Sequence, residues 1–155
     1  MTEPWIALVP LRAGSKGLPG KNTRPLAGKP LYRHAVDQGL EAGAAQVFIS
    51  TDIPDLLATD HGDNVHAVPR PAELAGDTVP MDAVLRHFLA ENFQQSATVV
   101  LLQATSPLRR AAHIRGALEV FARGAFDLVM SVTETAPTIL KYGPAAPDRR
   151  FVPVS

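Results

Sequence analysis

The sequence predicts an α/β fold in which a doubly wound, mostly parallel sheet is covered by helices. Short apolar runs of strand length alternate along the chain with segments whose apolar residues recur at helical spacing. The runs are rich in Val, Ile and Leu at successive positions, which is typical of strands buried on both faces. Strand and helix alternate throughout, and this order favours right-handed crossovers between parallel strands.

Five apolar runs are the candidate strands. Most have apolar side chains on both alternating faces, so we expect each run to form a strand of the sheet. The predicted strands cover residues 5–9, 46–49, 65–68, 98–102 and 128–132. No internal repeat or low-complexity linker interrupts the pattern, and the chain length suits a single domain over residues 1–155.

Three segments between these runs have apolar residues three and four positions apart, which places each set on one face of a helix. The sets are Leu31, Ala35, Val36 and Leu40 in the first segment, Met81, Val84, Leu85, Phe88 and Leu89 in the second, and Ile114, Ala117, Leu118 and Phe121 in the third. We therefore expect three amphipathic helices that pack against the sheet.

The bulk composition narrows the classes of partner. Fifteen basic and fifteen acidic side chains cancel, so the chain as a whole has no strong attraction to nucleic acid or to an anionic membrane. The absence of cysteine excludes disulfides, a thiolate metal site and a thiol nucleophile, and fits a reducing compartment. No signal-peptide pattern and no run of about 18 apolar residues occurs. We expect a cytoplasmic protein without a membrane span.

The loop after the first predicted strand concentrates positive charge. Six cations occur within residues 12–33, whereas residues 4–36 contain no acidic side chain. Gly14, Gly17 and Gly20 let the backbone of this loop approach a ligand closely, as phosphate-binding loops require. Several cations on such a loop suit a polyphosphate, and the alternative is a solvated basic loop whose glycines serve only turns.

The position of this loop favours a ligand site. In a doubly wound sheet, ligands bind beyond the carboxyl ends of the strands, next to the first strand, where the strand order reverses. The loops after the first and fourth strands, residues 11–22 and 103–109, are expected to meet there. A P-loop would need glycine in place of Ser15 and a hydroxyl in place of Asn22, and a dinucleotide fingerprint would need uneven glycine spacing. An ATPase and a dehydrogenase are therefore disfavoured.

The chain resembles the acylneuraminate cytidylyltransferases over nearly its whole length. Their long first signature is matched by residues 9–22, VPLRAGSKGLPGKN, and by residues 24–31, RPLAGKPL. The later matches, in the same order as in the family, are Ser50-Thr51-Asp52, Arg70-Pro71 with Glu73-Leu74, Asp77-Thr78, and QATSPLR at residues 103–109. The resemblance implies a Rossmann-like domain of the nucleotide-diphospho-sugar transferase type. It also implies transfer of CMP from CTP to the anomeric hydroxyl of a nonulosonic, sialic-acid-like sugar, with release of pyrophosphate.

The resemblance assigns roles to individual residues. Those that would hold the nucleotide are Leu11, Arg12, Ala13, Gly14, Ser15, Lys16, Lys21, Asn22 and Arg70, of which Arg12, Lys16 and Lys21 would be catalytic. Those that would hold the sugar acid are Gln103, Thr105, Ser106 and Lys141. The charges suit this reaction independently, because in-line displacement at the α-phosphate of CTP needs cations on the leaving group more than it needs covalent chemistry.

Three short polar features are candidates for the site, and the first two have two interpretations each. Ser50-Thr51-Asp52 either caps the helix that follows or lines the pocket. Thr105-Ser106-Pro107 has the composition of a helix start, and its hydroxyls equally suit a contact to substrate. Gln103 ends an apolar strand, where its amide needs a partner that a ligand can supply.

The family places a pair of metal-binding aspartates and a dimerisation segment well downstream of the QATSPLR loop. The chain ends at Ser155, before both, so we expect residues 1–155 to be a nucleotide-binding cytidylyltransferase domain without that C-terminal part. The resemblance implies Mg²⁺ and a homodimer, but no metal-binding residue is assigned within the chain. Val79 and Met81 stand near positions where the family often has small hydroxyl residues beside the cytosine.

Two alternative functions stay open. A 3-deoxy-manno-octulosonate cytidylyltransferase is the nearest enzyme, although its first loop typically has arginine at the position of Lys16 and lacks the Lys21-Asn22 pair. A nucleotide-binding module without turnover is the other alternative, and the end of the chain at Ser155 favours it. Neuraminate, legionaminate and pseudaminate are all compatible with the nonulosonic-acid interpretation.

Overall fold

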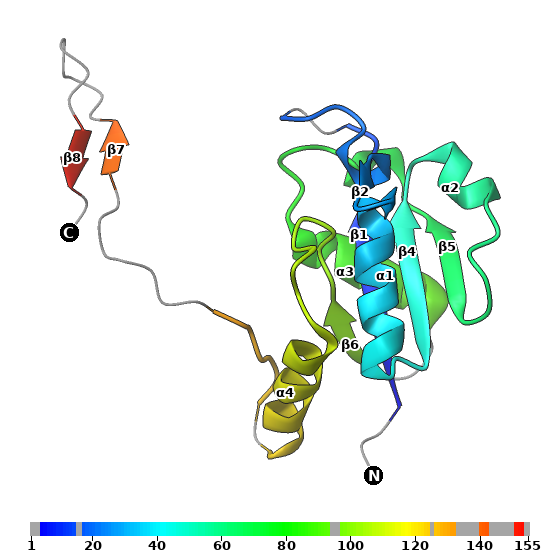
Figure 1. Ribbon diagram of the computed structural model, residues 1–155, viewed down its shortest axis with the longest axis vertical. Coiled ribbons are helices and arrows are strands. Elements are labelled where there is room, and N and C mark those ends of the chain that lie inside the picture. The colour runs from blue at the N-terminus through cyan, green and yellow to red at the C-terminus, as the bar shows by residue number, and fades with distance from the viewer. Residues whose placement is uncertain are drawn as a thin grey trace.

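Four parallel strands form the central sheet (Figure 1). A computed structural model describes residues 4–14, 17–93, 97–124 and 126–132, and the backbone of two short strands nearer the C-terminus. The strand order is β5-β4-β1-β6, with β1 at Trp5–Leu11, β4 at Gln46–Thr51, β5 at Val65–Pro69 and β6 at Thr98–Leu101. From β1 the chain proceeds outward to β4 and β5 and then returns to the other side of β1. The predicted doubly wound parallel sheet is confirmed.

Helices cover both faces of this sheet. The helical elements are α1 (Leu31–Ala42), α2 (Pro54–Ala58), α3 (Met81–Asn92) and α4 (Ala111–Ala122), with 3-10 turns η1 (Lys21–Thr23) and η2 (Ala72–Leu74). The small antiparallel pairs are β2 (Pro25–Leu26) with β3 (Lys29–Pro30), and β7 (Leu140–Tyr142) with β8 (Phe151–Pro153). The three predicted helices correspond to α1, α3 and α4. No helix within the described ranges is long and apolar enough to cross a membrane.

The side chains of β1 divide between two apolar clusters, one on each face of the sheet. Ala7 and Val9 pack in a cluster that α1 and α4 complete, whereas Ile6 and Leu8 pack with Phe88 of α3. Successive residues of a strand point to opposite faces, so a strand covered on both faces needs an apolar residue at every position. Full burial of each large aliphatic side chain stabilises the fold by about 1.5 to 3 kcal/mol.

Helix α1 lies close against the sheet because Gly39 has no side chain. A Cβ atom at Gly39 would lie 3.2 Å from the Ala7 Cβ and the Leu102 Cδ1, and 3.4 Å from the Val47 Cγ2. The helix ends at Gly43, whose φ of 96° is in the left-handed region that glycine tolerates. These two glycines therefore set the depth and the end of α1.

The predicted fifth strand at residues 128–132 is wrong. The structure has no strand there, and Leu128, Met130 and Val132 are 70%, 72% and 89% exposed. An apolar run becomes a strand only where a neighbouring strand accepts its backbone hydrogen bonds. Among the described strands, β6 pairs with β1 alone, so residues 128–132 have no partner in the sheet.

The predicted helix start at Thr105-Ser106-Pro107 is also wrong. Helix α4 begins at Ala111, and the residues before it form turns. The Ser106 N–H donates to the Gln103 carbonyl at 3.3 Å, and the Arg109 N–H donates to the Ser106 carbonyl at 3.2 Å. Serine and proline favour turns as strongly as helix starts, and here the turn prevails.

Gly39 and Gly116 offer a matched test of this packing. Gly39→Val is expected to lower the free energy of unfolding by about 1 to 3 kcal/mol, because the new side chain overfills the contact between α1 and the sheet. Gly116 lies in α4, where an added Cβ would meet nothing within 4 Å, so Gly116→Val should change stability by less than about 0.5 kcal/mol. Urea unfolding followed by circular dichroism measures both, and equal effects would contradict the close approach at Gly39.

Candidate functional site

The candidate site lies at the carboxyl edge of the sheet, where the loops after the parallel strands emerge (Figure 1). Residues 12–22 follow β1, and residues 103–110 follow β6 beside it. The ladder pairs Leu8 with Leu101, and the Leu102 N–H donates to the Leu8 carbonyl at 2.8 Å. The two loops therefore leave the sheet next to each other, as the sequence predicts.

The Arg12 guanidinium forms an ion pair with Asp77, which lies between η2 and α3. Both side chains are about one-third exposed, at 32% and 31%. An ion pair with this exposure is partly screened by water and contributes little to stability. Arg12 therefore holds a carboxylate that a more highly charged anion can displace.

Neighbouring side chains hold the backbone of the loop after β1. The Ala13 N–H donates to the Asp52 carboxylate at 2.8 Å, and the Asn22 amide donates to the Arg12 carbonyl at 3.1 Å. Asn22 is buried and lies in η1. The residue before η1 is Gly20, whose φ of 64° is left-handed. The Asn22 amide nitrogen thus stabilises the loop, a role for which the sequence carried no separate signal.

Arg70 is a buried arginine at the end of β5. Its Nη2 donates to the Ser50 carbonyl at 3.0 Å, and its Nε donates to the Ser50 hydroxyl at 3.4 Å. Burial lowers the pKa of Arg70 below its ordinary value, while the Asp52 carboxylate raises it and the Arg12 guanidinium lowers it further. Arg70, Asp52 and Arg12 therefore share one electrostatic environment although they come from different strands.

The residues of Ser50-Thr51-Asp52 have separate roles. Ser50 and Thr51 are buried within β4, and Asp52 reaches the loop after β1. The Thr51 hydroxyl accepts the Ile53 N–H at 3.1 Å, whereas the N-cap of α2 is Ile53, which makes no side-chain capping bond. The interpretation of this segment as a helix cap is wrong, because its polar atoms are used within and across the strand ends.

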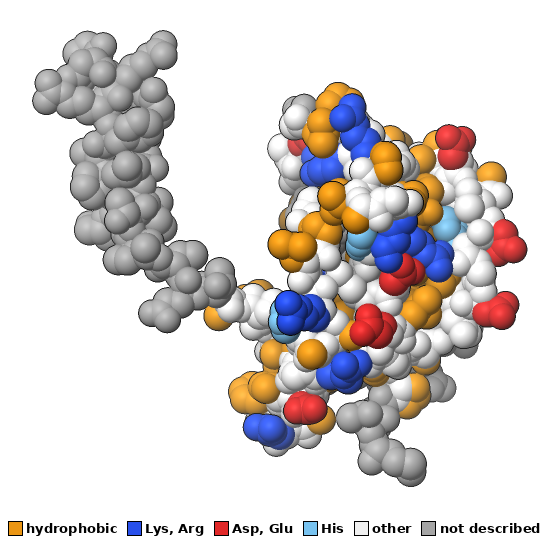
Figure 2. Space-filling view, in the orientation of Figure 1, with side chains coloured by type: hydrophobic (Ala, Val, Ile, Leu, Met, Phe, Trp, Pro, Cys, Tyr) orange, Lys and Arg blue, Asp and Glu red, His pale blue; other side chains and the backbone are white. Residues whose placement is uncertain are grey.

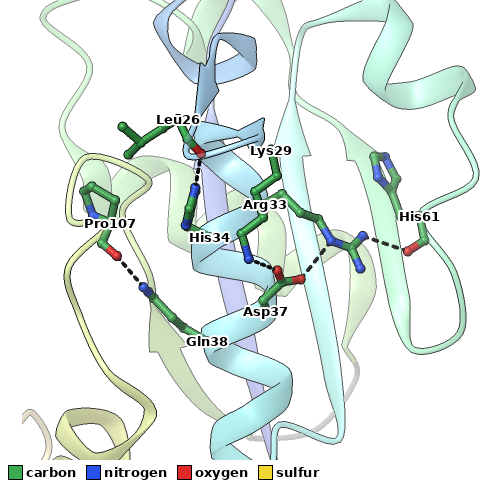
Figure 3. A network of polar contacts seen from close by, with 8 residues as sticks. All are labelled: Leu26, Lys29, Arg33, His34, Asp37, Gln38, His61 and Pro107. Atoms are coloured by element: carbon green, nitrogen blue, oxygen red, sulfur yellow. Dashed lines mark hydrogen bonds and ion pairs between the residues drawn. The ribbon is translucent and has the colours of Figure 1, made fainter.

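Gln103 follows β6 and is exposed at the edge of the sheet. Its carbonyl accepts the Arg109 Nη2–H at 2.9 Å, and Arg109 Nη1 donates to the Gln38 Oε1 at 3.1 Å. Gln38 in turn donates to the Pro107 carbonyl at 2.8 Å (Figure 3). Sequence reasoning missed the roles of Gln38 and Arg109. Two features of the sequence could have indicated these roles. Gln38 is an amide on the core side of an amphipathic helix, and Arg109 is the last residue of QATSPLR.

Ion pairs around α1 engage two of the cations that the sequence places near the candidate site (Figure 3). Lys29 and Arg33 both contact the Asp37 carboxylate, with Arg33 Nε at 2.8 Å from Oδ1. Arg33 also donates to the His61 carbonyl at 3.0 Å. The charges of Lys29 and Arg33 are thereby used to hold the hairpin β2–β3 and the loop at His61 against α1.

The other predicted site residues take several positions. Leu11 is buried in the apolar core, so its side chain faces the interior and not a ligand. Gly14, Thr105 and Ser106 are exposed, and Lys21 is partly buried. Ser15 and Lys16 lie outside the described residues. Lys141 lies in β7, where only the backbone is described.

The described residues do not offer a metal site. No group of three or more His, Cys, Asp or Glu side chains is placed to hold a metal ion in the described part of the chain. Near the basic loop, Asp52 accepts a backbone N–H and Asp77 pairs with Arg12. These residues therefore do not fit a protein-bound Mg²⁺.

The family profile described as Cytidylyltransferase matches residues 6–139. N-acylneuraminate cytidylyltransferase of Streptococcus agalactiae serotype III is 37% identical over 134 residues, covering 83% of this chain and 32% of that protein. CMP-N,N'-diacetyllegionaminic acid synthase of Legionella pneumophila is 40% identical over 122 residues, covering 74% of this chain and 52% of that protein. 3-deoxy-manno-octulosonate cytidylyltransferase of Methylococcus capsulatus is 32% identical over 123 residues, covering 79% and 47%. The chain thus spans from about a third to about half of the length of these relatives.

A solved structure has the same fold. The structure of CMP:2-keto-3-deoxy-manno-octonic acid synthetase complexed with CTP matches with a TM-score of 0.65 and 24% sequence identity. The match covers 78% of this chain and 48% of that chain. The likeness supports the α/β architecture described above.

Replacing Asp52 by alanine is expected to release the loop after β1 without unfolding the protein. The Asp52 carboxylate accepts the Ala13 N–H, and loss of such a charge-assisted bond costs about 1.5 kcal/mol, roughly tenfold in an opening equilibrium. Hydrogen exchange of the Ala13 amide, measured by NMR, should therefore become about tenfold faster.

Two variants control this measurement. Asp52→Asn retains a side-chain oxygen that can accept the same bond, so it should preserve most of the protection at Ala13. Asp60→Ala removes a carboxylate that accepts the Gly62 N–H at 2.9 Å in another loop, and should leave Ala13 unchanged. Unaltered exchange at Ala13 in Asp52→Ala would show that this carboxylate does not hold the loop.

Proposed function

Because the chain belongs to the cytidylyltransferase family, we propose that it transfers CMP from CTP to the anomeric hydroxyl of a nonulosonic acid, with release of pyrophosphate. The observation that carries this proposal is the anchored basic loop at the carboxyl end of β1. Its backbone is held by Asp52 and Asn22 while the Arg12 guanidinium points to an exchangeable carboxylate. A backbone anchored at Arg12 and Ala13, beside a displaceable counter-ion, suits a site for a polyphosphate.

The nature of the sugar acid is supported by the relatives. The two relatives named for nonulosonic acids are 37% and 40% identical to the chain, against 32% for the relative named for 3-deoxy-manno-octulosonate. The Lys21-Asn22 pair of the first loop favours the same choice, and Asn22 has a defined structural role in holding Arg12. We therefore assign a nonulosonic acid to the site ahead of the octulosonate.

The proposed reaction joins two anions. In-line attack of the anomeric hydroxyl on the α-phosphate breaks the bond between the α-phosphorus and the bridging oxygen, and pyrophosphate leaves with the electrons of that bond while the hydroxyl proton passes to solvent. When the triphosphate displaces Asp77, Arg12 clamps phosphate oxygens bidentately, and Lys21 adds a flexible charge from η1. Lys16, by resemblance, supplies a third cation. The charges of this loop thereby stabilise the leaving group as negative charge develops on it.

The sugar is proposed to lie over the loop after β6. Gln103 is exposed there, beside the carboxyl end of β1, and its amide can donate to and accept from neutral hydroxyl and acylamido groups. Arg109 and Gln38 hold the backbone of this loop from the α1 side. Gln103 is thus carried on a positioned loop next to the phosphate site.

Arg12→Ala is expected to weaken CTP binding about tenfold to a hundredfold, since a charged hydrogen-bond donor to phosphate is lost. Isothermal titration calorimetry measures the effect, and circular dichroism shows whether the fold is retained. Arg86→Ala is the matched control, because Arg86 lies on α3 with its side chain 84% exposed. Loss of CTP affinity in both variants would point to general charge and not to a site at Arg12.

The same titrations with ATP and GTP test the choice of base. We expect the wild-type protein to bind CTP more tightly than either purine nucleotide, because the Arg70 segment resembles the cytosine-reading part of the family. Equal affinity for the three nucleotides would leave a generic polyphosphate site and contradict base-specific recognition of CTP.

Gln103→Ala is expected to preserve CTP affinity but to lower turnover about tenfold to a hundredfold, if one or two hydrogen bonds to the sugar are lost. Pyrophosphate release is measured with CTP and a panel of neuraminate, legionaminate, pseudaminate and 3-deoxy-manno-octulosonate. Fastest release with the octulosonate would overturn the choice of sugar. Loss of CTP affinity with retained sugar binding would show that the two halves of the site are reversed.

A further inference from the structure

A concave site lies between α1 and α4, on the helical layer and not at the strand ends. Its volume is about 380 Å³. That volume lies at the lower end of the range for small-molecule sites. The charged residues that line it are Lys29, Asp37, Glu41, Arg109, Arg110 and Arg115. We name this concavity the α1–α4 pocket. It shares no lining residue with the loop after β1.

The α1–α4 pocket has a surplus of positive charge. Four of its charged residues are cations and two are carboxylates, which leaves a surplus of two positive charges in a chain with no net charge. Asp37 is already engaged by Lys29 and by Arg33 from outside the pocket (Figure 3). Figure 2 shows basic side chains over α1 and near the start of α4, with acidic side chains between them. The concavity therefore carries a net positive charge.

The three arginines of the pocket have no carboxylate partner among the described residues. Within the described ranges, neither Arg109, Arg110 nor Arg115 takes part in an ion pair. Arg115 donates to the Glu41 backbone carbonyl at 3.1 Å, not to its carboxylate. Arginine guanidinium groups present paired donors that match the oxygens of a phosphate. These side chains can therefore accept an anion without first giving up an ion pair.

Arg109 is the most buried of the three arginines. Its two acceptors are neutral oxygens, the Gln38 amide at 3.1 Å and the Gln103 carbonyl at 2.9 Å. Burial lowers the pKa of Arg109, because a guanidinium removed from water loses hydration that neutral oxygens only partly replace. A negative group in the adjoining pocket would offset this loss.

We propose that the α1–α4 pocket binds the phosphate group of a small molecule, with Arg109, Arg110 and Arg115 as its principal contacts. The charge surplus favours a dianion over a single carboxylate, and the concave shape favours a small molecule over an extended polymer. This site is distinct from the proposed CTP site and does not depend on it. Because Arg109 donates to the Gln103 carbonyl, occupancy of the pocket is transmitted directly to the loop after β6.

Titration with inorganic phosphate at constant ionic strength tests the site by NMR. Saturable shifts are expected at the Ala111 and Ala112 amides, which belong to lining residues, and at the Arg109 side chain. The double variant Arg110→Gln/Arg115→Gln should weaken this binding at least tenfold. Its control, Arg86→Gln/Arg123→Gln, removes the same charge from exposed positions outside the pocket and should leave the affinity unchanged.

Two further arms complete the experiment. Arg12→Ala should leave phosphate binding at Ala111 and Ala112 unchanged, which separates this site from the loop after β1. Titration with a hexose phosphate separates the two sources of the phosphate group. We expect the hexose phosphate to bind more tightly than inorganic phosphate, which would indicate a phosphorylated metabolite. Equal or tighter binding of inorganic phosphate would indicate free phosphate as the ligand. Shifts confined to residues 11–24, or an unchanged affinity in Arg110→Gln/Arg115→Gln, would overturn the proposal.

Discussion

The burial of β1 on both faces and along both edges is the constraint on which the rest of the structure depends. β1 pairs with β4 on one side and β6 on the other, and apolar clusters cover both of its faces. The chain leaves an enclosed strand of this kind at the carboxyl end, in the middle of the sheet. The loop that follows therefore emerges between the ends of the neighbouring strands, where polar groups from both sides can reach it.

The backbone and the side chains of this loop have different kinds of partner. Asp52 and Asn22 bind the Ala13 N–H and the Arg12 carbonyl, so backbone groups are satisfied by the protein itself. The Arg12 side chain instead pairs with the partly exposed Asp77, which water and ligands can reach. Backbone hydrogen bonds and an accessible arginine are thus combined at one place, an arrangement that suits the proposed phosphate site.

Asp37 divides the positive charge of the chain into two regions. By engaging Lys29 of β3 and Arg33 of α1, it separates the loop after β1 from the arginines at the start of α4. The two regions are still connected, because Arg109 bridges Gln38 of α1 and the carbonyl of Gln103. A ligand on the helical layer and a ligand at the sheet edge can therefore influence each other through the loop after β6.

Local sequence was sufficient for the strands β1, β4, β5 and β6, the helices α1, α3 and α4, and the basic loop after β1, because periodicity and charge are properties of consecutive residues. It failed at residues 128–132, where an apolar run lacks a strand to pair with, and at residues 105–107, where turn chemistry prevails over helix initiation. The contacts of Asp52 with Ala13 and of Arg109 with Gln38 join residues 39 and 71 positions apart. Only the tertiary structure decides such contacts, because the register of the parallel strands and the depth of α1 determine which distant side chains meet.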